Sequence, residues 1–202
     1  MRMFDGLPSA FAEIRQAGVN LARIPRTPSP DLRAAVARVL AGPTADFDLQ
    51  VDAGTFETRF AAALPPPALA ADLAADMAAI ARQFAAATGA CGLRARFERI
   101  EGPGCKLFHV DYVECRLITT YAGAGTEYLA DADVDRARLG RGSNRGIKRR
   151  GAAIARLAAY EIGLFKGEGW PGNRGGGIVH RSPPATREDP RLVFVLDALC
   201  AH

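Results

Sequence analysis

Two histidines and one aspartate in the second half of the chain have the side-chain types and the spacing of a metal site. His109 and Asp111 stand two residues apart in the sequence FHVD, and His180 lies in the sequence GGIVHRSPP. Residues i and i+2 of an extended backbone point to the same side, so the side chains of His109 and Asp111 are expected to converge. Two imidazoles and one carboxylate on one side of a divalent ion leave coordination positions open. The sequence therefore predicts a mononuclear metal site at these three residues, at the mouth of a β-barrel-like core.

Arg191 follows His180 after a proline-rich turn and begins another predicted strand. A guanidinium beside the second histidine can form a bidentate ion pair with a carboxylate. The order HxD, His and then Arg resembles the Fe(II)/2-oxoglutarate-dependent dioxygenase superfamily over residues 105–197. The resemblance implies that the metal is Fe(II), that Arg191 binds the distal carboxylate of 2-oxoglutarate, and that an unknown substrate is oxidised.

The strand after the HxD sequence adds two candidate cosubstrate residues. Arg116, Thr119 and Tyr121 form a pattern similar to a strand of prolyl-hydroxylase-like oxygenases. In those enzymes such polar groups help to hold the cosubstrate, which makes Thr119 and Tyr121 candidates for that role. The alternative is that both residues are ordinary strand formers.

A second resemblance covers the same half of the chain. It is carried by the sequences FHVDYVECRLITTYAGAGTEYL, LFKGEGW, GGIVHRSPP and RLVFVLD, at residues 108–129, 164–170, 176–184 and 191–197. These segments resemble the bacterial domain-of-unknown-function family eighteen-twenty-six. The resemblance groups the same residues together and implies no reaction. The family's association with gene neighbourhoods of metal homeostasis, especially of zinc, suggests a second function.

The second function is a non-catalytic, zinc-binding accessory protein that uses the same triad. If one strand continued from His109 to Cys115, the Cys115 side chain would point to the same side as those of His109 and Asp111. Cys105 precedes them in the sequence. A thiolate ligand would favour zinc over iron. The alternative is that both cysteines are packing residues. No pair of cysteines has CxxC spacing, so neither a zinc ribbon nor a thioredoxin motif is indicated.

The elements that must position these residues fall into two regions. Residues 1–90 have helical signals: a helix near Ser9–Ala17, a helix after the N-cap Ser29, and a long helix from the prolines at 65–67 to Thr88, closed by Gly89. Residues 91–202 have short strand patterns separated by glycine and proline, as at Leu93–Ile100. We expect an α+β protein: a double-stranded β-helix (jelly-roll or cupin-like) core over residues 91–202, with the N-terminal helices packed outside it.

Charge and hydropathy limit where the protein acts and which partners it binds. The net charge is +4, and no apolar run is long enough to cross a bilayer, which predicts a cytoplasmic protein with no membrane partner. Residues 131–151 contain seven basic residues and little apolar content. They are expected to form an exposed, mobile loop that acts as a lid or binds an anionic partner. A nucleic-acid partner is disfavoured, because the loop has no aromatic side chains for base stacking.

Overall fold

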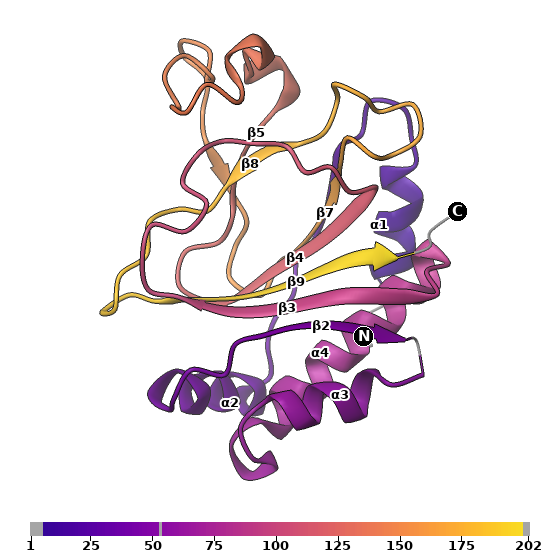
Figure 1. Cartoon of the computed structure of the whole chain (residues 1–202), viewed down its shortest axis with the longest axis vertical. Helices are drawn as coiled ribbons and strands as arrows, with labels where there is room; N and C mark the ends of the chain where they lie inside the picture. The colour runs from indigo at the N-terminus through magenta and orange to yellow at the C-terminus, as the bar shows by residue number, and fades with distance from the viewer. Residues whose placement is uncertain (1–5, 53, 200–202) are drawn as a thin grey trace.

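A six-stranded antiparallel sheet with the order β1-β7-β4-β9-β3-β2 forms the centre of the protein (Figure 1). The computed structural model describes residues 6–52 and 54–199. A second antiparallel sheet, with the order β6-β5-β8, lies over one face of the first (Figure 1). The strands are β1 (Leu21–Ile24), β2 (Phe47–Asp52), β3 (Gly92–Ile100), β4 (Cys115–Ala122), β5 (Glu127–Leu129), β6 (Ala155–Arg156), β7 (Ile162–Lys166), β8 (Val179–Arg181) and β9 (Arg191–Leu199).

Helices cover the other face of the large sheet (Figure 1). They are α1 (Gly6–Ile14), α2 (Pro30–Ala41), α3 (Phe56–Ala63) and α4 (Pro67–Thr88). The predicted N-cap is confirmed, because the Ser29 hydroxyl accepts a hydrogen bond from the Leu32 amide at 3.1 Å. The predicted end of α4 is confirmed as well: Gly89 adopts the left-handed conformation, with a φ of 69°. No helix among the described residues is long and apolar enough to cross a membrane.

The main hydrophobic core lies between α4 and the large sheet. Four apolar residues of α4 at helical spacing are fully buried there: Leu73, Met77, Ile80 and Phe84. Burial of each such side chain contributes roughly 1.5–3 kcal/mol, so this stripe fixes the helix against the sheet. A smaller apolar cluster, which includes Ile118 of β4 and Val193 of β9, covers the opposite face of the sheet. The candidate site lies on that opposite face.

The first half of the chain supplies both edge strands of the large sheet. β1 pairs with β7, and β2 pairs with β3. β2 was missed, although Phe47, Leu49 and Val51 alternate with polar residues in the period-two pattern of a strand. The antiparallel α+β class is confirmed, with the addition that the N-terminal region is part of the sheet as well as of the helical layer.

Residues 131–151, called the arginine lobe below, differ from the expected solvated loop. They contain two 3₁₀ turns, and Val134 pairs with Lys148 in an isolated antiparallel bridge. Val134 and Ile147 are buried in a cluster with Phe108 and Val179. The expectation of a solvated loop with too little apolar surface to dock is therefore wrong at these two residues, which pack the lobe beside the site.

Candidate metal centre

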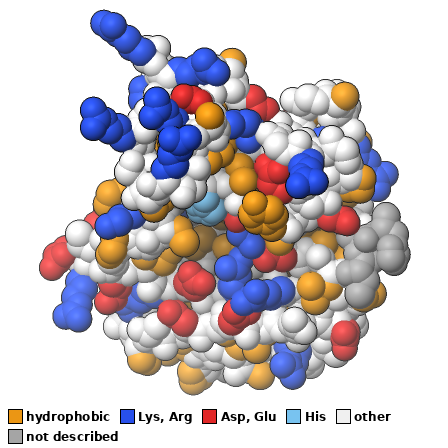
Figure 2. Space-filling model, turned by 45° about the horizontal axis from the view of Figure 1, so that its top comes forward, with side chains coloured by type: hydrophobic (Ala, Val, Ile, Leu, Met, Phe, Trp, Pro, Cys, Tyr) orange, Lys and Arg blue, Asp and Glu red, His pale blue; other side chains and the backbone are white. Residues whose placement is uncertain are grey.

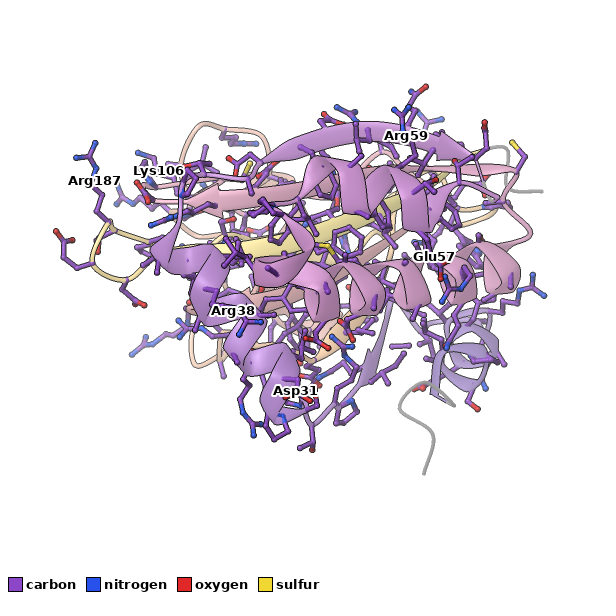
Figure 3. All side chains as sticks on the ribbon, turned by 90° about the horizontal axis from the view of Figure 1, so that it is seen from below. Asp31, Arg38, Glu57, Arg59, Lys106 and Arg187 are labelled. Atoms are coloured by element: carbon purple, nitrogen blue, oxygen red, sulfur yellow. The ribbon has the colours of Figure 1, made fainter. Side chains whose placement is uncertain are left out.

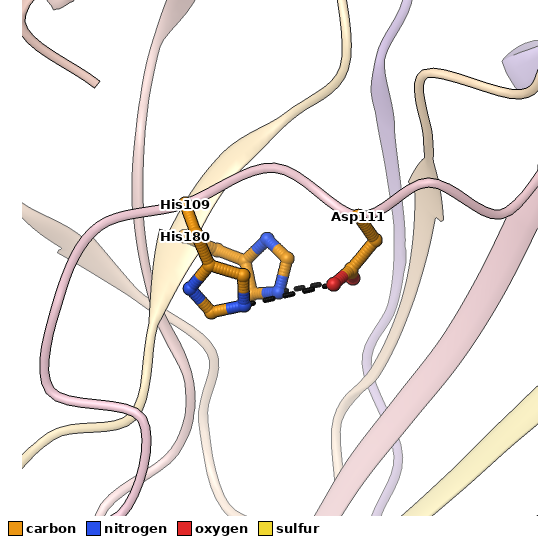
Figure 4. A group of neighbouring side chains, drawn as sticks. All are labelled: His109, Asp111 and His180. Carbon is orange, nitrogen blue, oxygen red and sulfur yellow. Dashed lines mark ion pairs between the residues drawn. The ribbon is translucent and has the colours of Figure 1, made fainter. Parts of the chain in front are cut away.

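His109 and His180 face each other as a hydrogen-bonded antiparallel pair. The amide of each donates to the carbonyl oxygen of the other at 3.0 Å. Opposed residues of such a pair project their side chains from the same face, and the two imidazole centroids are 4.5 Å apart. Asp111 points toward both rings (Figure 4). The three residues each offer a ligand atom, and all three atoms lie within 4.8 Å of one another, so the sequence-predicted triad converges.

Backbone carbonyls fix the tautomer of both imidazoles. The Nδ1 atom of His109 lies 2.9 Å from the carbonyl oxygen of Leu107, and that of His180 lies 3.1 Å from the carbonyl oxygen of Ile178. A carbonyl oxygen only accepts, so each Nδ1 must donate its proton and each neutral ring keeps its lone pair on Nε2. Outer contacts of this kind orient histidines that bind metals through Nε2.

The two Nε2 atoms are directed at the Asp111 carboxylate. The Nε2 of His180 lies 3.2 Å from Oδ2 of Asp111, and the Nε2 of His109 lies 3.6 Å from Oδ1 (Figure 4). The Oδ2 atom is buried and has no hydrogen-bond partner among the described residues. Lone pairs on nitrogen and oxygen repel one another unless a proton or a cation lies between them. The donor set therefore fits a divalent metal ion.

Burial and neighbouring charges act on the acid–base properties of these groups. Burial, and then the charge of His180, lowers the pKa of His109 below its ordinary value. Burial alone would raise the pKa of Asp111, but its contact with His180 and the charge of Arg116 hold it well below the usual range. Asp111 is thus ionised and His109 favours its neutral form, which are the forms that bind metal.

Arg116 links Asp111 to a buried carboxylate beneath the site. Its NH1 group lies 2.8 Å from Oδ1 of Asp111, and its Nε and NH2 groups donate to both oxygens of Asp197 at 2.6 and 2.9 Å. Arg96 of β3 also donates to Asp197, at 3.2 Å. One oxygen of Asp111 is therefore held by Arg116, which leaves Oδ2 directed at His180.

This contact predicts that Arg116→Ala weakens metal binding about 10- to 100-fold, the range typical for loss of a group that orients a metal ligand. Removing the guanidinium charge also relieves its repulsion of a cation, so the two effects oppose each other, and we expect orientation to dominate. Arg96→Ala is the matched control, since Arg96 contacts Asp197 but not Asp111. Equilibrium dialysis with Fe(II) in the absence of oxygen measures both variants. Equal losses, or tighter binding by Arg116→Ala, would contradict the orienting role.

The LFKGEGW segment positions Asp111 through close backbone contact. The amide of Glu168 donates to the carbonyl oxygen of Asp111 at 2.8 Å, and the amide of Gly167 donates to the carbonyl oxygen of Glu114 at 2.9 Å. A Cβ atom on Gly167 would collide with the carbonyl oxygen of Val113. Only glycine fits at this position without a shift of the segment that carries Asp111.

Gly167→Ala is accordingly expected to destabilise the protein by about 1–3 kcal/mol, as overpacking does, and to lower its metal affinity, because the collision is relieved by moving the Asp111 segment. Gly102→Ala is the control, because a Cβ at Gly102 meets nothing within 4 Å. Urea unfolding and metal dialysis of both variants check this. Unchanged metal affinity in Gly167→Ala would show that the segment tolerates the shift.

A cavity of about 100 Å³ lies against the two histidines of the triad and the large sheet. His109, His180, Arg116, Ile118 and Arg191 are among the residues that line it. Arg191 is 1% exposed and donates to the carbonyl oxygen of Ala124 at 2.5 Å and to the hydroxyl of Ser182 at 2.9 Å. Arg191 has no ion pair with any carboxylate of the described residues, and burial lowers its pKa to about 10. A buried guanidinium without a carboxylate is suited to an anionic ligand.

Thr119 and Tyr121 lie on the opposite face of β4, away from this cavity. The Tyr121 hydroxyl donates to Asp76 of α4 at 2.6 Å, and both residues are buried. The polar residues that the cavity contains instead are Ser182 and Thr126. Ser182 follows His180 by two residues, so the same i, i+2 argument that joins His109 to Asp111 could have identified it.

The cysteines do not join the triad. Cys115 is buried on the side of the helices, and burial raises the pKa of its thiol to about 12. Cys105 is exposed and lines the cavity. The cluster of possible ligands in the described part of the chain contains only His109, Asp111 and His180. A thiolate ligand, the feature that would favour zinc, is therefore not part of this centre.

Comparison of the sequence with models of known protein families identifies the family of the chain. A family model described as "Protein of unknown function (DUF1826)" matches residues 6–197, which confirms the resemblance that the sequence indicates. No curated protein matches the chain by sequence.

Three solved structures that align with this chain are described as a dioxygenase, a prolyl-4-hydroxylase and a 2OG-Fe(II) oxygenase family protein. The dioxygenase for auxin oxidation of rice aligns with a TM-score of 0.54 at 13% identity, covering 96% of this chain and 79% of that chain. A prolyl-4-hydroxylase of Pseudomonas putida aligns with a TM-score of 0.49 at 13% identity, covering 96% and 98%. A 2OG-Fe(II) oxygenase family protein of Burkholderia pseudomallei aligns with a TM-score of 0.46 at 12% identity, covering 98% and 92%. The likeness to the rice enzyme shows a shared fold.

Proposed function

The chain belongs to the DUF1826 family of proteins of unknown function. From the geometry of its site we propose that it is an Fe(II)- and 2-oxoglutarate-dependent oxygenase. In this proposal His109, Asp111 and His180 hold the metal, and Arg191 binds the distal carboxylate of 2-oxoglutarate. The observation that carries the proposal is a converging His-Asp-His donor set whose two histidines line one cavity together with a buried arginine that has no carboxylate partner among the described residues.

The arrangement of the sheets supports a double-stranded β-helix, or jelly-roll, as the core of this enzyme. The small sheet lies over the large one (Figure 1), and residues from both sheets, Tyr128 of β5 and Val193 of β9 among them, meet in one apolar cluster. His180 comes from β8 of the small sheet, and Arg191 begins β9 of the large one. The metal and the cosubstrate would therefore lie between the two sheets.

The donor set fits Fe(II). Two imidazoles and one carboxylate with open positions form the facial triad of non-haem ferrous oxygenases. Bound Fe(II) would supply the oxidative chemistry that couples decarboxylation of 2-oxoglutarate to oxidation of a substrate. The chain's own residues have simpler roles: Asp111 and the two Nε2 atoms bind the ion, and Arg116 orients Asp111.

Arg191 would bind and orient the cosubstrate. A planar guanidinium matches a carboxylate in fork geometry, and Ser182 fixes its position through a hydrogen bond of 2.9 Å. Ile118 and Val193 form an apolar part of the cavity wall. These aliphatic side chains would exclude water from the cavity once the cosubstrate is bound, which strengthens the ion pair.

Metal-dependent binding of 2-oxoglutarate tests the proposal. Calorimetric titration without oxygen should show binding to the Fe(II)-loaded protein and much weaker binding to the metal-free protein, because a chelate is completed only when the ion is present. Protein purified without added iron should be analysed for its metal content at the same time. Tight, stoichiometric zinc together with no affinity for 2-oxoglutarate would favour the accessory protein instead.

A further inference from the structure

We propose that the arginine lobe, residues 131–151, is a docking surface for an acidic polypeptide segment, and that a side chain of this segment is the group that the metal centre oxidises. The second half of this inference rests on the proposed function, and the first half does not. The lobe lies beside the site but contributes neither a metal ligand nor a cavity residue. Its charge, its position and the chemistry of the neighbouring cavity each support the inference.

The lobe carries the net charge of the whole protein. Seven of the 26 Lys and Arg residues and three of the 22 Asp and Glu residues lie in it, so it has a charge of +4, and the rest of the chain is neutral. Arg136 and Arg138 form ion pairs with Asp131 and Asp135. Four further arginines are exposed and form no ion pair within the described part of the chain: Arg141, Arg145, Arg149 and Arg150. Such an excess of unpaired cations on one element attracts a polyanion.

The lobe is built as a fixed surface rather than as a free loop. The amide of Asp135 donates to the carbonyl oxygen of Ile147 at 2.7 Å, and the amide of Arg149 donates to that of Asp133 at 2.8 Å. Its apolar side, Val134 and Ile147, packs on residues that precede the two metal-binding histidines, Phe108 and Val179. The arginines are thus presented from a folded support, which lowers the entropic cost of binding a partner.

One segment of the chain, residues 105–109, contacts both the lobe and the cavity. The Asn144 side chain, between Arg141 and Arg145, donates to the carbonyl oxygen of Lys106 at 2.8 Å and accepts from the amide of Phe108 at 2.7 Å. The segment held by these bonds lines the cavity through Cys105 and His109. Figure 2 shows the basic side chains of the lobe gathered beside the exposed histidine surface. A chain bound along the arginines would therefore pass the mouth of the cavity.

The chemistry of the cavity favours a polypeptide over a nucleic acid. The residues that line it are arginine, glutamate, histidine, cysteine, serine, threonine and aliphatic residues, and Phe, Tyr and Trp are absent from the described lining. The arginine lobe has no aromatic residue either. Proteins that act on unpaired or flipped bases hold them by stacking on aromatic side chains. The aliphatic and polar cavity, of about 100 Å³, fits the side chain of a peptide, and the arginines fit its neighbouring carboxylates.

Binding of a labelled peptide rich in Asp and Glu to the full chain tests the docking surface. We expect fluorescence anisotropy to show salt-dependent binding, and Arg141→Glu/Arg145→Glu to weaken it at least about tenfold, because each reversal places like charges together. The matched control is Arg38→Glu/Arg59→Glu, with the same charge change on exposed arginines of α2 and α3, on the helical side of the molecule (Figure 3). This control should bind within about twofold of the unchanged protein, since its charges lie outside the proposed surface. Equal losses in both variants would overturn the inference.

A duplex DNA oligonucleotide of equal charge forms the competing arm of the experiment. Tighter binding of the DNA than of the peptide at the same salt concentration, lost in Arg141→Glu/Arg145→Glu, would replace the polypeptide with a nucleic acid. Peptide binding needs neither metal nor 2-oxoglutarate. A protein that binds the peptide but forms no succinate therefore refutes the proposed oxygenase, and a protein that forms succinate but binds no peptide refutes the docking surface.

Alkylation of Cys105 by iodoacetamide, a neutral reagent, tests whether the peptide reaches the cavity mouth. Cys105 is exposed and lines the cavity, whereas Cys115 is buried. Bound peptide should slow alkylation of Cys105, as located by mass spectrometry, and the slowing should be lost in Arg141→Glu/Arg145→Glu. Unchanged alkylation with the peptide bound would place the peptide away from the site and overturn its assignment as substrate.

Discussion

Asp111→Ala should lower the Fe(II) affinity of the protein by much more than the roughly 10- to 100-fold expected for loss of an outer contact, because it removes one of three ligands. The Oδ2 atom of Asp111 lies 3.2 Å from the Nε2 of His180 and has no hydrogen-bond partner among the described residues. Without this carboxylate, the two histidines remain as a neutral pair that holds a divalent ion weakly. Equilibrium dialysis against Fe(II) without oxygen, followed by metal analysis, measures the loss.

The fold should survive this change, because Arg116 keeps both of its hydrogen bonds to Asp197. Asp48→Ala is the control, since Asp48 pairs with Arg94 on the surface of β2 and β3, outside the metal cluster. Thermal unfolding of both metal-free variants should show cooperative transitions. If Asp111→Ala binds Fe(II) as tightly as the control, the carboxylate is not a ligand and the triad is refuted.

Arg191→Met should remove most of the affinity for 2-oxoglutarate while leaving the metal content unchanged. Loss of one partner of a buried, hydrogen-bonded charge pair costs about 2–5 kcal/mol, or roughly 30-fold to several thousandfold in affinity. Burial lowers the pKa of Arg191 to about 10, so its charged form is less favourable in the folded protein than in water. Removing the charge relieves this cost and offsets the loss of the hydrogen bonds to Ala124 and Ser182.

The stability of Arg191→Met therefore separates a binding role from a structural one. A binding role predicts that the metal-free variant unfolds at nearly the same urea concentration as the unchanged protein. Val195→Ala, a conservative change to another residue that lines the cavity, is the control for altered cavity shape. A large loss of stability in Arg191→Met, with metal and 2-oxoglutarate binding falling together, would show that Arg191 has a structural role instead.

Much of the site follows from local periodicity in the sequence. The convergence of His109 and Asp111 depends only on the alternation of an extended backbone. It is present although residues 105–112 form no strand and only a single bridge, at His109. Helix signals were equally local, as the cap at Ser29 and the termination at Gly89 show. These features are set by neighbouring residues, so a single sequence contains the information for them.

The features that differ from the sequence-based expectation depend on which face of a strand a side chain occupies, or on contacts between residues far apart in the sequence. Arg116 and Thr119 are three residues apart, so on one strand they must point to opposite faces, and only Arg116 reaches the cavity. The assignment of Thr119 and Tyr121 to the cosubstrate ignored this parity. Ser182 could have been found by the same rule. The docking of the arginine lobe depends on Val134 and Ile147 meeting Phe108, which no local pattern encodes.

Succinate formation from 2-oxoglutarate tests the central claim most directly. The purified protein, loaded with Fe(II) and supplied with oxygen, 2-oxoglutarate and ascorbate as the reductant, should form succinate slowly even without its substrate. Asp111→Ala and Arg191→Met should each abolish this reaction, whereas Asp48→Ala should leave it intact. Succinate formation at equal rates by all of these proteins, or none by an unchanged protein shown to hold Fe(II), would contradict the account.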